Sequence, residues 1–178
     1  MDAVSVGWSR LSFNAGQGAY LNTTPAENNE YNIPKGYEDI ISYFKENQTK
    51  THLSVYMDTS ERVEAANGST DVCSAVLLDS AQRTKAVGAI VNELTVSYKT
   101  IGFNPYSGVT IDFEGMKGVA LKEGFNAFLS ELSEALKPLG KTLYVAVPPA
   151  TSDGYYYDAY DFRRIGALAD KVILMAHD

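Results

Sequence analysis

The sequence contains few residues of the kinds that bind metals, form disulfides or hold polyanions. One cysteine, Cys73, excludes a disulfide within the chain. Together with only two histidines, it leaves too few nitrogen and sulfur ligands for an ordinary zinc site. Fifteen Lys and Arg stand against 22 Asp and Glu, which gives a net charge of −7. Without a basic cluster, neither nucleic acid nor an anionic membrane surface is an expected partner.

Long apolar runs are also lacking. No stretch of roughly 18 apolar residues is present, so the sequence predicts no segment that inserts into a membrane. The opening MDAVSVGWSRL lacks the basic and apolar regions of a signal peptide. Hydrophobic residues nevertheless make up 45% of the 178 residues, which is enough for one sizeable core. We therefore expect residues 1–178 to form a single domain.

Strand and helix patterns alternate along the chain. The predicted strands are 3–13, 51–58, 107–114, 141–150 and 171–178. The predicted helices begin near Pro34 or cover 79–98, 119–140 and 160–170. Such alternation favours an α/β fold with a parallel sheet. A complete (β/α)8 TIM barrel needs roughly 250 residues, and this sequence stops directly after a strand, so we expect an incomplete barrel rather than a smaller open sheet.

Two carboxylates close the third predicted strand, in YSGVTIDFEGMKG at residues 106–118. Strand alternation sorts this segment into an apolar row and a polar row, the latter with Thr110, Asp112 and Glu114. In a barrel the polar row would face the axis, and Glu114 would lie at the carboxyl end, where such folds keep their active sites. Asp112 and Glu114 would repel each other, which favours a proton on one of them, as a general acid requires. A structural ion pair is the alternative.

The same segment carries a resemblance to a known family. SGVTIDFE resembles the D-G-x-D-x-D-x-E signature on the fourth strand of glycoside hydrolase family 18, the chitinase-like family, and especially its bacterial spore-cortex and cell-wall branch. KVILMAHD resembles the M-x-Y-D motif of the sixth strand, while THLSVYMD and TLYVAVPPA fall where the third and fifth strands would lie. The resemblance implies a partial catalytic domain that covers about strands two to six of the barrel.

The resemblance implies a retaining glycosidase that hydrolyses N-acetylglucosamine-containing polysaccharide, such as chitin or peptidoglycan. Glu114 would be the acid and base, and Asp112 would orient the substrate's 2-acetamido group, which attacks the anomeric carbon. Other implied substrate-binding residues are Thr110, Tyr144, Met175, His177 and Asp178. No cofactor or metal is expected. The implied partner is a polysaccharide or oligosaccharide, and the implied location is extracellular or associated with the cell wall or spore.

Some positions depart from the family pattern or allow two interpretations. Ser107 and Thr110 stand where the pattern has its first two aspartates, and His177 stands where it has a tyrosine. These departures fit an enzyme with an altered pH profile, and they also fit a non-catalytic carbohydrate-binding barrel. A small α/β domain with structural carboxylates is a third possibility.

Aromatic residues and one further carboxylate are also candidates for the site. Trp8 either packs in the sheet or forms the floor of a sugar subsite. The run YYYDAY at 155–160 either forms an aromatic platform for sugar rings or packs beneath a loop. Asp58 is either a helper carboxylate or a cap for the loop behind it. We also expect that part of a barrel alone would lack some walls of the sugar site and could be inactive.

Overall fold

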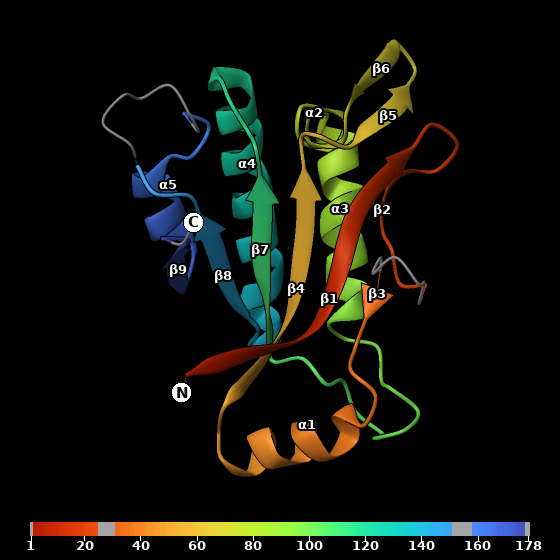
Figure 1. The fold of residues 1–178 in the computed structure, drawn as a ribbon, viewed down its shortest axis with the longest axis vertical. Helices are drawn as coiled ribbons and strands as arrows, with labels where there is room; N and C mark the ends of the chain where they lie inside the picture. Colours follow the sequence, from red (N-terminus) through yellow and green to blue (C-terminus); the bar gives the residue numbers. More distant parts are fainter. Residues whose placement is uncertain (1, 25–30, 151–157, 177–178) are drawn as a thin grey trace.

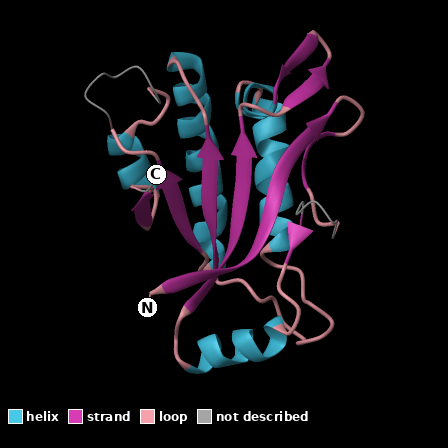
Figure 2. Ribbon diagram, in the orientation of Figure 1, coloured by secondary structure: helices cyan, strands magenta, loops and turns pink. Residues whose placement is uncertain are grey.

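A seven-stranded sheet forms the centre of the molecule in the computed structural model, which describes residues 2–24, 31–150 and 158–176 (Figures 1 and 2). Its parallel strands, in their order across the sheet, are β1 (Ala3–Asn14), β4 (Lys50–Asp58), β7 (Gly108–Glu114), β8 (Thr142–Val147) and β9 (Lys171–Leu174). The short strands β2 (Gly18–Leu21) and β3 (Tyr31–Asn32) pair antiparallel with β1. The five predicted strands and their parallel arrangement are confirmed. Within the described residues the sheet is open, with β2 and β9 at its edges.

The helices lie mainly on one side of this sheet (Figure 1). They are α1 (Tyr37–Glu46), α2 (Val72–Leu77), α3 (Ser80–Glu93), α4 (Val119–Leu136), the 3-10 helix η1 (Lys137–Leu139) and α5 (Phe162–Leu168). Helices α2 to α5 cover the sheet, whereas α1 lies below the amino ends of β4 and β7 (Figure 1). Among the described helices, none is both long and apolar enough to cross a bilayer.

Several details differ from the predicted elements. The segment between β4 and α3, for which no element was predicted, contains a hairpin of β5 (Arg62–Ala65) and β6 (Gly68–Asp71). The hairpin leads into α2, where the Asp71 carboxylate caps the helix by accepting from the Ser74 N–H. The helix predicted over 79–98 begins after its Asp79 cap but ends at Glu93. It ends early because the Thr95 hydroxyl donates to the carbonyl of Val91 and so satisfies the last turn.

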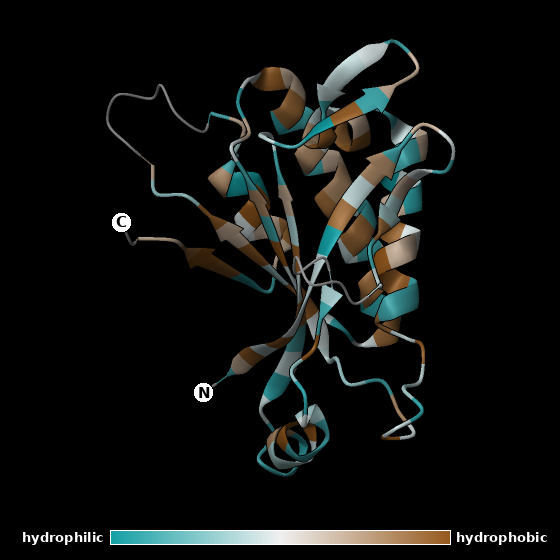
Figure 3. Ribbon diagram, turned by 45° about the vertical axis from the view of Figure 1, so that its right-hand side comes forward, coloured by the Kyte–Doolittle hydropathy of each residue, from teal (hydrophilic) through white to brown (hydrophobic). Residues whose placement is uncertain are grey.

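The apolar row of β7 is buried against the helices, as its alternation predicts. Val109, Ile111 and Phe113 are each 0% exposed. The Phe113 ring packs between Phe125 and Phe128 of α4, with ring centres 5.7 and 5.3 Å away. Burial of each such side chain contributes about 1.5–3 kcal/mol, so this row fixes which face of β7 turns away from the helices. Figure 3 shows hydrophobic segments along the strands and along the helices packed on them.

The opposite row of the sheet is polar and only partly buried at its carboxyl end. On β4 the partly exposed residues are Ser54, Tyr56 and Asp58, which alternate with fully buried apolar ones. Cross-strand pairing sets Tyr56 level with Asp112 and Asp58 level with Glu114. The polar faces of β4 and β7 therefore form one continuous surface, which ends at the two predicted carboxylates.

Candidate active site

Asp112 and Glu114 lie at the carboxyl end of β7, on the face away from the helices. β7 pairs with β4 up to Glu114, but it pairs with β8 only up to Ile111. Both carboxylate side chains are partly exposed. Beside Glu114 is a cavity of about 380 Å3, a volume within the range of small-molecule sites, and Asp112 is not among the residues that line it. The residues that line it are Asp58, Glu114, Gly115, Pro148, Pro149, Tyr160 and Met175.

The backbone after Glu114 turns sharply and requires glycine. Gly115 has a φ of 71°, which L-residues rarely adopt, and a Cβ atom there would lie 2.3 Å from the Thr59 Oγ1. The Thr59 hydroxyl donates to the Gly115 carbonyl at 3.0 Å, and the Thr59 N–H donates to the Glu114 carbonyl at 3.4 Å. These contacts join the ends of β4 and β7, so the position of Glu114 depends on both strands.

Asp58 supplies the second carboxylate that lines the cavity of Glu114. The Tyr56 hydroxyl donates to Asp58 Oδ2 at 3.0 Å, and the Ser60 N–H donates to Asp58 Oδ1. Burial alone would raise the pKa of Asp58, but these hydrogen bonds and the charge of Arg10 outweigh burial and hold its pKa below the usual range. Asp58 thus stays ionised, and it both caps the following loop and faces the cavity of Glu114.

An aromatic and cationic group lies farther along the same face, on β1 and β4. The rings of Trp8 and Tyr56 stack with centres 6.3 Å apart. The Arg10 guanidinium lies 5.0 Å from the Tyr56 ring centre and 5.7 Å from that of Trp8, and it pairs with Glu61 at 3.2 Å. Trp8 therefore packs on the sheet and stays partly exposed beside the polar row, so both interpretations of Trp8 stay open.

Thr110 and Tyr144 lie one layer deeper than Asp112. They are level with each other across β7 and β8, and both are buried. His52 contacts Thr110 through Nδ1 at 3.1 Å and Thr142 through Nε2 at 2.8 Å, and its ring packs against Tyr144. Burial, with a smaller effect from Lys50, lowers the pKa of His52 to about 4, so this layer is neutral at physiological pH.

The structure thus separates the predicted substrate-binding residues into two groups. Met175 lines the cavity beside Glu114, where its N–H donates to the Val147 carbonyl at 2.9 Å. Thr110 and Tyr144 instead line a separate hollow near the amino end of β1. His177 and Asp178 lie outside the described residues.

Ser107, which stands where the family pattern has its first aspartate, has a structural role. Its Oγ accepts from the Thr51 N–H at 2.8 Å and donates to the Thr51 carbonyl at 3.1 Å. These hydrogen bonds join β7 to β4 near their amino ends, far along the strands from the cavity of Glu114.

Two neighbours of the carboxylates, Tyr56 and Arg10, were not among the predicted site residues, and a third, Tyr160, was considered only as part of an aromatic run. Tyr56 and Arg10 share the polar row by strand pairing, which alternation along β1 and β4 could have indicated. Tyr160, the last residue of the YYYDAY run, is 4% exposed, and its ring packs edge-on against Phe125. Tyr160 is thus packed against α4 and also lines the cavity of Glu114, whereas residues 155–157 of the run lie outside the described residues.

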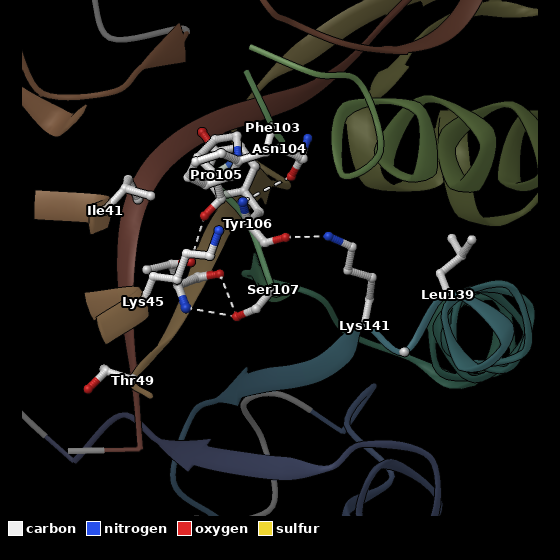
Figure 4. A pocket seen from close by; sticks show the side chains of 12 residues that line it. Ile41, Lys45, Thr49, Phe103, Asn104, Pro105, Tyr106, Ser107, Leu139 and Lys141 are labelled. Carbon is white, nitrogen blue, oxygen red and sulfur yellow. Dashed lines mark hydrogen bonds between the residues drawn. The ribbon is translucent and has the colours of Figure 1, made fainter. Parts of the chain in front are cut away.

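A different cavity, of about 310 Å3, lies at the amino ends of the strands beside α1 (Figure 4). None of the residues lining it is an Asp or Glu. The Lys141 ammonium donates to the Tyr106 carbonyl, and burial lowers the pKa of Lys141. The Lys45 ammonium lies 4.1 Å from the centre of the Phe103 ring. This second cavity has no carboxylate among its lining residues, whereas Asp58 and Glu114 line the other one, so the cavity of Glu114 is the better candidate active site for acid and base chemistry by carboxylates.

Comparison with known proteins identifies glycosylases and chitinases as relatives. No protein-family model matches the chain. YdhD of Bacillus subtilis, a sporulation-specific glycosylase by name, is 35% identical over 111 residues, which are 62% of this chain and 24% of YdhD. The cortical fragment-lytic enzyme of Bacillus subtilis is 29% identical over 92 residues, or 50% of this chain and 20% of that enzyme.

Solved structures give the same result for the fold. The crystal structure of YdhD matches 83% of this chain and 44% of its own, with 30% identity and a TM-score of 0.63. A chitinase from Chromobacterium violaceum matches 100% of this chain and 49% of its own, with 25% identity and a TM-score of 0.63. The chain thus spans about half of these solved structures and a quarter or less of the curated relatives. Over that span, the predicted resemblance to the chitinase-like and spore cortex-lytic glycoside hydrolases is confirmed in both sequence and fold.

Proposed function

We propose that this chain forms part of the catalytic domain of a glycosidase that hydrolyses polysaccharides containing N-acetylglucosamine, such as chitin or peptidoglycan. The observation that carries the proposal is the position of Glu114: it ends a parallel strand, lies level with Asp58 and lines a cavity at the carboxyl edge of the sheet. The names of its relatives, a sporulation-specific glycosylase and a cortical fragment-lytic enzyme, support this class of substrate.

In the proposed mechanism Glu114 gives its proton to the glycosidic oxygen as the bond to the anomeric carbon breaks. The carbonyl oxygen of the substrate's own 2-acetamido group attacks that carbon from the opposite face, while Asp112 holds the acetamido N–H. Glu114 then removes a proton from the water that opens the resulting ring. Two inversions at one carbon give net retention of configuration.

The surroundings of the carboxylates suit these roles. The ionised Asp58 places a second carboxylate level with Glu114 at the same cavity. Met175 supplies an apolar wall to the same cavity. Trp8 and Tyr56 offer stacked rings along the face on which a longer glycan would lie.

The order of strands supports a proposal on architecture. Each parallel strand lies beside the one that precedes it, and the helices lie on one side, as in a (β/α)8 barrel. We propose that β1, β4, β7, β8 and β9 correspond to barrel strands two to six and that residues 1–178 are one partial catalytic domain. An association with the cell wall or spore follows from the same relatives.

The experiment that tests this function compares three forms of the full-length protein: wild type, Glu114→Gln and Glu131→Gln. The Glu131 control removes the same charge on α4, where Glu131 pairs with Arg83 away from the cavity. With chitin oligomers and peptidoglycan as substrates, Glu114→Gln should lower turnover by a factor of about 10² to 10⁴. The Glu131 variant should remain within about twofold of wild type. Equal turnover in wild type and Glu114→Gln would overturn the proposal.

A non-catalytic carbohydrate-binding protein is the second candidate. The residues at two family aspartate positions favour it, because Ser107 and Thr110 are engaged in hydrogen bonds to Thr51 and His52 and carry no charge. This candidate predicts that the wild type binds chitin or peptidoglycan but releases no product at any pH.

A further inference from the structure

We propose that Tyr160 is a positioning residue for Glu114: its buried hydroxyl fixes the end of β7 by donating to the carbonyl between the two carboxylate residues. The hydrogen bond runs from the Tyr160 Oη to the Phe113 carbonyl oxygen at 2.5 Å. The inference rests on the proposed function of Glu114, and it adds to that function a side chain from the segment before α5.

Strand pairing explains why the Phe113 carbonyl needs this donor. Successive carbonyls of a strand point to opposite sides, toward alternate neighbours. The Glu114 carbonyl accepts from the Thr59 N–H, which follows β4, so the Phe113 carbonyl points toward β8. The β7–β8 ladder, however, ends at the pair of Ile111 and Val145. Tyr160 supplies a donor where the ladder stops, and so extends the support of β7 to its last residues.

Tyr160 is itself held firmly. Its ring is 4% exposed and packs edge-on against Phe125, with ring centres 5.9 Å apart. The next residue, Asp161, caps α5 by accepting from the Arg164 N–H at 2.9 Å. A ring fixed by α4 on one side and by the start of α5 on the other gives the hydroxyl a defined position.

The hydroxyl also remains a donor over the working pH range. Burial raises the pKa of Tyr160 above its ordinary value, and the nearby charges of Glu114 and Asp112 act in the same direction. The phenol therefore stays protonated beside the carboxylates. Tyr160 also lines the cavity of Glu114, so this support lies directly at the candidate active site.

Loss of the hydroxyl should affect chemistry more than substrate binding. The Phe113 carbonyl belongs to the peptide unit that joins Phe113 to Glu114, so its release lets the Glu114 backbone shift. A misplacement of about 1 Å can cost about 10²-fold in rate. We expect Tyr160→Phe to lower kcat by about 10- to 100-fold and to leave KM within about twofold.

The experiment measures kcat, KM and melting temperature for the full-length wild type, Tyr160→Phe, Glu114→Gln and the double variant on a chitin oligomer. Tyr106→Phe is the matched control, because Tyr106 is equally buried and its hydroxyl contacts Tyr31, away from the cavity. This control should keep the wild-type kcat even if its melting temperature falls. Because Tyr160 acts through Glu114, the double variant should be no slower than Glu114→Gln alone.

The outcomes separate the two proposals. If Glu114→Gln keeps wild-type turnover, the proposed function fails. If Glu114→Gln loses turnover but Tyr160→Phe keeps its kcat within twofold, only the role of Tyr160 is overturned. Equal kcat losses in Tyr160→Phe and Tyr106→Phe would also overturn it, because the effect would then follow stability rather than position.

Discussion

Alanine in place of Gly115 should destabilise the protein more than alanine at Gly102, although the two glycines have nearly the same backbone conformation. Their φ angles are 71° and 73°. A Cβ at Gly102 meets nothing within 4 Å, whereas a Cβ at Gly115 lies 2.3 Å from the Thr59 Oγ1. The pair therefore separates backbone strain, which both variants share, from the collision at the end of β7.

The magnitudes follow from these contacts. The left-handed conformation costs an L-residue about 1–2 kcal/mol at either position. At Gly115 the Thr59 side chain must also leave its rotamer, at about 0.5–1.5 kcal/mol. It must give up its hydrogen bond to the Gly115 carbonyl as well, at about 1 kcal/mol. We expect Gly115→Ala to cost about 1.5–2.5 kcal/mol more than Gly102→Ala.

Urea unfolding of wild type and both variants measures this difference. A cycle with Thr59→Ala adds a sharper test, because removal of the Thr59 hydroxyl removes the collision partner. Gly115→Ala should therefore cost less in the Thr59→Ala background than in the wild type. If Gly115→Ala lowers the free energy of unfolding no more than Gly102→Ala does, Thr59 does not approach Gly115 as closely as the structure shows.

Three further predictions concern the core, the neutral layer and the aromatic rings. Phe113→Ala should lower the free energy of unfolding in urea by about 3–5 kcal/mol because the ring is fully buried, whereas Phe162→Ala, at an exposed position, should lower it far less. Similar losses in the two variants would contradict the packing of β7 on α4. The pKa of His52 is about 4 in the folded protein and 6.5 ordinarily, so its neutral form contributes stability that is fully present above pH 6.5 and is lost as pH falls through 4. The free energy of unfolding should fall by about 3 kcal/mol over this range. A His52→Gln variant with an unchanged pH dependence of stability would refute this. Trp8→Ala should weaken oligosaccharide affinity by about 2- to 10-fold in a direct binding titration if the ring supports a sugar, and leave affinity unchanged if it only packs.

The sequence predicted the central strands well because their patterns are long and regular. Alternation along β7 separates residues such as Phe113, which packs on α4, from Asp112 and Glu114 on the other face, and burial confirms this division. The short elements were missed. Strands β5 and β6 contain four residues each and α2 contains six, too few for a period to emerge from polar surroundings.

The candidate site was predictable only in part. Period-two alternation assigns Thr110 and Glu114 to one face but gives no depth, and four residues along a strand span about 13 Å. Thr110 therefore lies outside the cavity of Glu114 and contacts His52. The contact of Tyr160 with Phe113 joins residues 47 positions apart. It depends on where the β7–β8 ladder ends, and local sequence patterns do not carry that information.

The leaving-group dependence of Glu114→Gln tests the central claim most directly. A general acid is needed when the departing oxygen is a poor leaving group and is nearly dispensable when it is a good one. We predict that Glu114→Gln lowers kcat/KM by a factor of about 10² to 10⁴ on a chitin oligomer. The loss should be far smaller on a 2,4-dinitrophenyl N-acetylglucosaminide, because its dinitrophenolate leaving group departs without a proton. An equal loss on both substrates would contradict the assignment of Glu114 as the acid.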